Sequence, residues 1–258
     1  MKFSANLGFL FTEMDLPDAI RAAAGAGFDA VECHFPYKFD AADVAAALRE
    51  TGLSMLGLNT LPGDLSAGDF GLAALPDREQ EARAEITRAV DYAAAIGAGA
   101  VHVMAGRTDG GPAARAIYHA NLGFACDLAA AHGITILIEP INHRDVPGYH
   151  LSEVEQAADI IAEMDRQNLR LMFDCYHTQI MQGDLTRRIE THLPIIGHIQ
   201  IAAVPDRGEP DAGEVDFRWL LHRLGEMGYD RPIGAEYKPR SGRTGDGLGW
   251  LAAFSSET

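Results

Sequence analysis

The sequence predicts an α/β fold, a closed (β/α)₈ barrel of the TIM type. Short apolar segments alternate with amphipathic helices along the chain, which is the order that produces a parallel sheet. Eight such segments can be counted, and 258 residues match the roughly 250 of an ordinary barrel. A doubly wound open sheet is the alternative. Its glycine fingerprint is missing, because the run GAGFDA at residues 25–30 precedes a strand instead of following one.

The eight expected strands are short apolar runs, and several of them follow a glycine closely. They cover residues 3–6, 29–34, 53–59, 100–104, 134–139, 169–174, 196–201 and 232–237. A glycine at this place closes the preceding helix, because it readily adopts the left-handed conformation. Such glycines are Gly27, Gly97, Gly133 and Gly228. No linker or low-complexity tract interrupts the pattern, so we expect a single barrel domain over residues 1–258.

The segments between the strands have helical periodicity. Residues 78–96 repeat small apolar side chains on one face, and Ser152 with Glu155 has the spacing of a capping box. The helix before the last strand has an apolar stripe formed by Phe217, Leu220, Leu221 and Leu224.

Composition restricts the class of protein. The net charge of −16 disfavours non-specific binding to nucleic acid, which depends on basic residues. No apolar run has membrane-spanning length, and Asn6 and Glu13 interrupt the N-terminus too early for a signal peptide. The three cysteines are scattered and indicate no disulfide framework. We therefore expect a cytoplasmic protein that binds neither nucleic acid nor membrane, and a homo-oligomer is compatible with the sequence.

Three longer loops follow strands and could cover the mouth of the barrel, where the sites of such barrels are built. They comprise residues 60–79, 106–115 and 202–217, each rich in Gly, Pro and Asp. A glycine-rich surface turn explains the second loop at least as well as a phosphate cradle, because no Lys-Ser/Thr pair completes a P-loop.

Four consecutive strands deliver an oxygen-bearing side chain at or near their ends. These side chains are Glu139, Asp174, Gln200 and Glu236. A charged group at the tip of a buried strand is costly unless something binds it. In a closed parallel barrel the four side chains would meet at one mouth. As isolated strand ends they could instead cap neighbouring loops.

An all-oxygen set of this kind favours a hard divalent cation, Mg²⁺ or Mn²⁺, whereas zinc more often binds His or Cys. Four protein oxygens leave two octahedral positions for the adjacent oxygens of an α-hydroxy carbonyl compound. Such a cation stabilises the charge that develops when a C–H proton leaves. Glu139 and Glu236, one on each side of the substrate, would serve as base and acid.

Five further residues are candidates for contact with the substrate. His177 follows Asp174 by three positions, and Arg207 lies in a mouth loop with few other cations, where a bidentate carboxylate clamp is expected. Lys238 points the same way as Glu236, one step further out. Asn59 and His102 end their strands and would line the pocket wall. A structural loop histidine, a solvated arginine and a rim lysine are the simpler alternatives.

Several motifs together resemble the hydroxypyruvate isomerase family, within the xylose-isomerase-like TIM barrels. The resemblance runs over nearly the whole chain. It is carried by FSANLGFLFTE, VECHFPYKFD, LNTLPGD, GLAALPDRE, VHVMAG, IEPINHRDVPGYHL, FDCYH, GHIQIA, PDRGEPDAGEVDF and GAEYKPR.

The resemblance implies that Glu139 and Glu236 are the catalytic glutamates and that Asp174 and Gln200 complete the metal site. It implies interconversion of hydroxypyruvate and tartronate semialdehyde, or the homologous reaction of 2-oxo-tetronate. INHRDVPGYHL resembles hydroxypyruvate isomerases, whereas LNTLPGD and IAAVPDR resemble 2-oxo-tetronate isomerases, so the length of the keto-acid substrate stays open.

Three other functions compete with this hypothesis. A ketose 3-epimerase uses the same barrel and glutamates, although Gln200 stands where such epimerases commonly have histidine. A barrel nuclease of the endonuclease IV type would need a His-rich metal site and a basic face, and neither is evident. A non-catalytic barrel that binds keto acids or sugars would more readily tolerate the loss of one glutamate, yet both are present.

Overall fold

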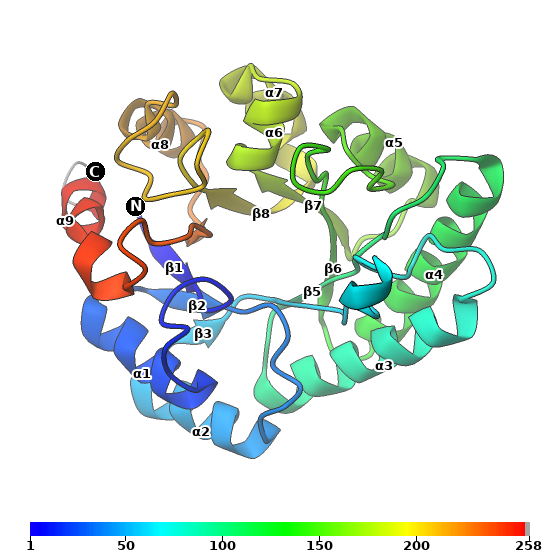
Figure 1. Cartoon of the computed structure of the whole chain (residues 1–258), viewed down its shortest axis with the longest axis horizontal. Coiled ribbons are helices and arrows are strands. Elements are labelled where there is room, and N and C mark those ends of the chain that lie inside the picture. Colours follow the sequence, from blue (N-terminus) through cyan, green and yellow to red (C-terminus); the bar gives the residue numbers. More distant parts are fainter. Residues whose placement is uncertain (256–258) are drawn as a thin grey trace.

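The computed structural model describes residues 1–255, and its strands form a parallel barrel surrounded by helices (Figure 1). The order around the sheet is β3-β2-β1-β9-β8-β7-β6-β5-β4. Because β3 and β4 are neighbouring pieces of one segment, the two ends of this order meet and the ring closes. The predicted TIM barrel is therefore confirmed.

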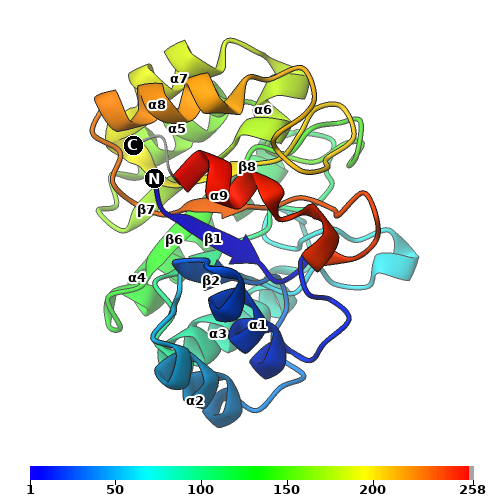
Figure 2. The ribbon, with the colours of Figure 1, turned by 90° about the vertical axis from the view of Figure 1, so that its left-hand side faces the viewer.

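Each strand lies within its predicted range. Their bounds are β1 Phe3–Asn6, β2 Ala30–Glu32, β3 Ser54–Met55, β4 Leu58–Asn59, β5 Ala100–His102, β6 Thr135–Ile138, β7 Leu169–Asp174, β8 Ile196–Ile201 and β9 Ile233–Ala235. The longer loops gather at the end of the barrel toward which β1 points (Figure 2). This is the carboxyl end of the strands, where we expect the site.

The third predicted strand, residues 53–59, is broken into β3 and β4. β3 pairs with β2, and β4 pairs with β5. Between the two pieces, the Leu56 N–H donates to Val31 and the Cys33 N–H donates to Gly57, at 2.7 and 3.1 Å. The backbone therefore bends at Leu56 and Gly57, while the Leu56 N–H and the Gly57 carbonyl keep hydrogen-bond partners on the segment of β2.

Helices form the outer ring. They are α1 Leu16–Ala26, α2 Ala41–Thr51, α3 Glu79–Ile96, α4 Pro112–Ala130, α5 Val154–Met164, α6 Cys175–Met181, α7 Leu185–His192, α8 Phe217–Glu226 and α9 Gly249–Ser255. Asp15 and Asp40 cap α1 and α2 with their side chains, and left-handed Gly27 and Gly97 close α1 and α3. Gly133 and Gly228 are also left-handed, but they lie three and two positions beyond the last residue of their helix.

One predicted cap is wrong. Ser152 does not cap α5; Glu153 is the N-cap, without a side-chain bond. The side chain of Gln182 caps the helix instead, because its amide oxygen accepts a hydrogen bond from the Val154 N–H at 2.9 Å. Glu155 bonds Gln182 and Arg188 instead of the helix start. Long-range partners thus displaced the local capping box.

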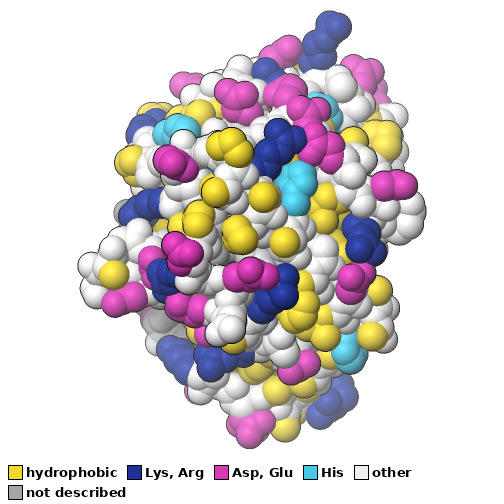
Figure 3. Space-filling model, turned by 90° about the vertical axis from the view of Figure 1, so that its right-hand side faces the viewer, with side chains coloured by type: hydrophobic (Ala, Val, Ile, Leu, Met, Phe, Trp, Pro, Cys, Tyr) yellow, Lys and Arg dark blue, Asp and Glu magenta, His cyan; other side chains and the backbone are white. Residues whose placement is uncertain are grey.

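Apolar helix faces cover the outside of the barrel, including the predicted stripe of α8. On the side where α3 and α4 lie, acidic and basic side chains are interspersed over the surface (Figure 3). None of the helices in residues 1–255 is long and apolar enough to cross a bilayer. Inside the barrel, a cavity of about 290 Å³ lies beneath the mouth. Small residues line part of it, among them Gly57, Gly99, Ala100 and Gly197.

Two glycines, Gly71 and Gly106, allow the loop of residues 60–79 to lie close against the segment that follows β5. Gly71 forms an antiparallel bridge to Ala105, and the Ala74 N–H donates to the Ala105 carbonyl at 2.7 Å. The backbones approach so closely that a Cβ on Gly71, which has a φ of +112°, would lie 2.7 Å from the Gly106 nitrogen. Only glycine meets both demands, of conformation and of space.

We therefore expect Gly71→Ala to lower the free energy of unfolding by about 3 kcal/mol, from backbone strain plus overlap. Gly110→Ala is the matched control. Its φ is also positive, +74°, but a Cβ there would have no atom within 4 Å. This control is expected to lose only about 1 kcal/mol. Urea titration measures both, and equal losses would show that contact with the barrel contributes nothing.

Candidate active site

A pocket of about 210 Å³ opens at the carboxyl ends of the strands. It lies directly above the interior cavity, and Asn59 and His102 line both. The polar side chains in its wall are His34, Asn59, His102, Glu139, His177, Arg207 and Glu236. Glu139 and Glu236 each stand one residue beyond a strand, β6 and β9 respectively, and both line this pocket.

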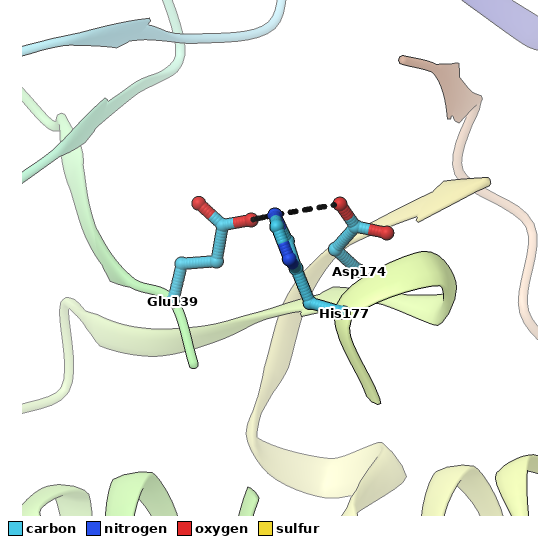
Figure 4. Close-up of side chains that lie close together, drawn as sticks. All are labelled: Glu139, Asp174 and His177. Atoms are coloured by element: carbon cyan, nitrogen blue, oxygen red, sulfur yellow. Dashed lines mark ion pairs between the residues drawn. The ribbon is translucent and has the colours of Figure 1, made fainter. Parts of the chain in front are cut away.

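Glu139, Asp174 and His177 form a buried cluster at the mouth, and their potential ligand atoms lie within 4.8 Å of one another. The two carboxylates point toward each other, with the imidazole between them (Figure 4). His177 Nε2 is 3.7 Å from Glu139 Oε1 and 3.5 Å from Asp174 Oδ2. The other Asp174 oxygen accepts from the Tyr176 N–H at 2.7 Å and caps α6. One oxygen of Asp174 thus fixes the strand-to-helix turn, and the other faces the pocket.

The orientation of His177 follows from its second nitrogen. Nδ1 accepts from the backbone N–H of Asn142 at 3.3 Å, and the Asn142 side-chain nitrogen lies 2.6 Å away. A nitrogen that accepts carries no proton, so the proton of the neutral ring lies on Nε2, facing the carboxylates. Burial first, and then the positive charge of Arg207, holds the pKa of His177 well below its usual value. The ring is therefore a neutral donor.

Glu236 has three partners, each from a different part of the chain. Arg207 Nη2 donates to Oε2 at 2.6 Å, while Asn6 Nδ2 and His34 Nε2 each lie 2.9 Å from Oε1. Burial alone would raise the pKa of Glu236. The charge of Arg207 and the His34 contact outweigh this effect and hold the pKa below its ordinary value. Glu236 is ionised.

Arg207 supplies the positive charge of the mouth. Its Nη2 also lies 3.4 Å from Asp174 Oδ2, and its guanidinium lies over the rings of Phe9 and Tyr176, 5.0 and 4.9 Å from their centroids. The backbone of Arg207 is left-handed, with φ of +57°. Its Nε is buried without a hydrogen-bond partner among the described residues. One donor of this guanidinium therefore remains for a ligand.

Glu139 and Asp174 carry the charge that Arg207 does not neutralise. Burial, then the negative charges of Glu236 and Asp174, raises the pKa of Glu139 well above its usual range. Burial raises the pKa of Asp174 to about 7, although Arg207 opposes the shift. In the ionised state, both carboxylates would gain from a further cation.

The donor atoms left without partners fit a divalent cation. Within residues 1–255, Glu139 Oε1 and Gln200 Oε1 are buried and make no hydrogen bond. Asp174 and Gln200 are paired residues of neighbouring strands, so they stand at the same level of the barrel. Oxygen ligands of this kind suit Mg²⁺ or Mn²⁺. Of the four predicted ligands, Glu139 and Asp174 belong to the close group, together with His177, whereas Glu236 does not, and Gln200 lines the interior cavity below.

The remaining predicted residues differ in their positions. His102 lies in the pocket wall with Nδ1 3.5 Å from Glu139 Oε2, and neither ring nitrogen has a hydrogen-bond partner in the described chain. Burial lowers the pKa of His102 to about 3, so the ring is neutral. Asn59 also lines the pocket. Lys238 is exposed; its ammonium lies 5.5 Å from the ring centroid of Phe9, at the rim.

Sequence reasoning missed several polar residues of the barrel interior. They are Ser4, Asn6, Glu32, His34 and His198. A signal for them exists, because Ser4–Asn6, Glu32–His34 and His198–Gln200 are polar pairs two residues apart. Side chains at that spacing point to the same face of a strand. Applied to every strand, this pattern would have found them.

Of the three loops expected to cover the mouth, two reach the pocket. Residues 60–79 contribute Pro62, Leu65 and Phe70, and residues 202–217 contribute Arg207. The loop 106–115 adds no side chain to the described lining. Instead the loop after β6, which was not among the three loops expected to cover the mouth, contributes Ile141 and Val146.

Comparison with known proteins identifies relatives over the full barrel. A sequence profile of the xylose isomerase-like TIM barrel family matches residues 20–254. The 2-oxo-tetronate isomerase of Cupriavidus necator is 47% identical over 256 residues, covering 98% of each chain. The hydroxypyruvate isomerase of Escherichia coli is 37% identical, covering 98% of this chain and 99% of that one.

A solved structure is similar as well. The crystal structure of a Brucella melitensis protein described as AP endonuclease, family 2 is 42% identical, covers 98% of both chains and has a TM-score of 0.93. These matches confirm the resemblance seen in the sequence motifs. The chain therefore belongs to the xylose isomerase-like TIM barrel family and, within it, to the group of isomerases that contains hydroxypyruvate isomerase and 2-oxo-tetronate isomerase.

Proposed function

We propose that this protein is a metal-dependent aldose–ketose isomerase of short hydroxy-keto acids. Its substrate would be hydroxypyruvate, giving tartronate semialdehyde, or the homologous 2-oxo-tetronate. The observation that supports this proposal best is the pocket, where Glu139 and Glu236 face one space of about 210 Å³. That volume is below the 300–1,000 Å³ typical of drug-sized ligands, which favours a molecule of three or four carbons.

The reaction needs two proton transfers at carbon. For hydroxypyruvate, a proton leaves the hydroxyl-bearing carbon, a proton is delivered to the former carbonyl carbon, and the hydroxyl proton moves to the carbonyl oxygen. Glu139 and Glu236 follow strands that are separated by β7 and β8, so they stand on different walls of the pocket. One accepts the proton and the other serves the return transfer, in an order that depends on the direction of reaction.

The neutral imidazoles would position the oxygen atoms of the substrate. His177 presents Nε2–H beside Glu139 and Asp174, and its ring is fixed through Asn142. His102 has two ring nitrogens without partners in the described structure. Each can offer a hydrogen bond at low energetic cost, because the ring is already desolvated and orientated.

Arg207 is proposed to hold the substrate carboxylate. Its Nη2 bonds Glu236, whereas its buried Nε–H has no acceptor among the described residues. A carboxylate accepting from that nitrogen would gain a charge-assisted hydrogen bond. Lys238, at the rim, would add long-range attraction for the anion.

Glu139, Asp174, Gln200 and Glu236 are the groups proposed to hold Mg²⁺ or Mn²⁺, with His177 beside them. When bound, the cation supplies charge stabilisation for the carbonyl and hydroxyl oxygens of the substrate. In the described structure the Arg207 guanidinium bridges Asp174 and Glu236, which indicates that this position accommodates positive charge.

Proton NMR of the purified protein with hydroxypyruvate in D₂O tests the reaction. With Mg²⁺ we expect tartronate semialdehyde with deuterium at carbon, and a chelator should abolish its formation. Turnover of 2-oxo-tetronate but not hydroxypyruvate would assign the four-carbon substrate. Inversion of a ketose at C3 without either isomerisation would instead establish the epimerase, and binding of keto acids without turnover would establish the non-catalytic barrel.

Glu139→Gln and Glu236→Gln should each reduce kcat by at least about 100-fold, because proton transfer by a positioned carboxylate contributes that much or more. Glu190→Gln, at an exposed position of α7, is the control and should retain full activity. Circular dichroism checks that the variants remain folded. A folded Glu139→Gln or Glu236→Gln enzyme with normal kcat would refute the mechanism.

Arg207→Lys keeps the positive charge but removes the Nε donor. We expect KM for the keto acid to rise about 10- to 100-fold, the equivalent of one charged hydrogen bond. Arg240→Lys is the control, because Arg240 bonds Asp206 and Glu209 beside Arg207 but does not line the pocket. Steady-state kinetics separate KM from kcat. Similar increases in both variants would attribute the effect to the shape of the loop.

A further inference from the structure

Glu32, the last residue of β2, lies at the centre of a hydrogen-bond network inside the barrel, and the residue is only 4% exposed. Its Oε1 accepts from Asn6 Nδ2 and Gln200 Nε2, at 2.9 and 2.8 Å. Its Oε2 accepts from Ser4 Oγ at 3.1 Å and faces His198 Nε2 at 2.5 Å. Both oxygens are occupied, so Glu32 is satisfied by the protein and has no free oxygen for a substrate.

The barrel provides space for this network at one glycine. Gly234 on β9 pairs with Gln200, and a Cβ at Gly234 would lie 2.8 Å from Gln200 Cγ, Glu32 Oε1 and His198 Nε2. Contacts that short do not occur in folded proteins. The φ of Gly234 is not in the left-handed region. Glycine is therefore required here because a side chain would not fit, and not because of the backbone conformation.

Glu32 determines which end of the Gln200 amide is left without a partner. A carboxylate accepts hydrogen bonds and does not donate them, so only the nitrogen end of the amide can turn toward Glu32. The oxygen end must then face the other way. That oxygen, Oε1, is buried and has no partner within the described chain. An amide free to rotate would present nitrogen and oxygen alternately, and only oxygen binds a hard cation.

Glu32 also restrains Glu236 through Asn6. The Asn6 side-chain nitrogen donates to Glu32 Oε1 and to Glu236 Oε1, both at 2.9 Å. Asn6 Oδ1 accepts from the Gly8 N–H at 2.9 Å, which fixes the orientation of the amide. Each of the two hydrogens on the nitrogen thereby has one carboxylate.

We infer that Glu32 is a positioning residue for the metal site, which it serves by holding the oxygen of Gln200, and through Asn6 the carboxylate of Glu236, toward the cation. This inference rests on the proposed function only in requiring that a divalent cation binds at the mouth. Partners in this position orient the ligands of metal sites, and their loss commonly weakens metal binding 10- to 100-fold.

Isothermal titration of metal-free protein with Mn²⁺ tests this role without measuring activity. In Glu32→Gln, the new amide can donate to Gln200 and allow its side chain to turn over. We expect the dissociation constant for Mn²⁺ to increase 10- to 100-fold. Ser4→Ala is the matched control, because it removes a bond to the other oxygen of Glu32, and its affinity should match that of the wild type. Should Glu32→Gln not fold, Glu32→Asp keeps the charge but shortens the reach, and the same loss is expected.

A second substitution distinguishes loss of the orientation of Gln200 from general disruption of the barrel interior. Gln200→Glu in the Glu32→Gln background supplies an oxygen whichever way the side chain turns, so Mn²⁺ affinity should recover. Equal affinity of wild type and Glu32→Gln would overturn the inference, and so would a loss that Gln200→Glu leaves unchanged. Absence of Mn²⁺ binding to the wild type would instead refute the proposed metal site, and the inference with it.

Discussion

The structure depends on the burial of several carboxylates in one barrel. Glu32, Glu139, Asp174 and Glu236 are each at most 6% exposed, and their charges act on one another through an interior that screens weakly. Folding can tolerate this only because each charge is offset in a different way. Glu32 has four donors, Glu236 has Arg207, His34 and Asn6, and Asp174 shares Arg207 and a helix N-terminus. Glu139 has the least compensation, and its pKa rises most clearly. The incomplete balance at Glu139 and Asp174 favours positive charge at the mouth when both carboxylates are ionised.

The rest of the barrel accommodates this arrangement. The strands are short, and polar side chains occupy the upper lumen where larger apolar residues would otherwise interdigitate. Small residues below them leave a cavity, and Gly234 leaves room for the Glu32 network. Stability therefore comes mainly from the outer layer, where the apolar helix faces pack on the strands. The division separates two tasks: the outer shell maintains the fold, and the lumen positions the polar groups.

Much of this architecture could be predicted from the sequence, because strand tips and apolar periodicity are local signals. All observed strands lie within the predicted ranges, and Glu139 and Glu236 line the same pocket at the mouth. The features that could not be predicted from the sequence depend on tertiary contacts between distant segments. The Glu32–His34 pair marks a polar face, but the hydrogen bonds of Glu32 to Asn6 and Gln200 join three different strands and cannot be read from its own segment. The bonds of Arg207 to Asp174 and Glu236 depend on how a long loop folds back. The predicted capping box of Ser152 and Glu155 is absent because Gln182, after α6, bonds the Val154 N–H, and Gln182 and Arg188 of α7 bond Glu155.

Within residues 1–255, the strand that completes the barrel, β9, is also the last of the strands to be synthesised. Because β9 lies between β1 and β8, a nascent chain that still lacks it presents two unpaired strand edges, and such edges are templates for aggregation. The same chain already contains Arg207 and Asn6 but not Glu236, so their partner is missing as well. Sealing the hydrogen-bond ladder and balancing the charges at the mouth thus happen together, when residues 233–236 join the sheet. The demand for chaperone protection is concentrated in the interval before residues 233–236 emerge.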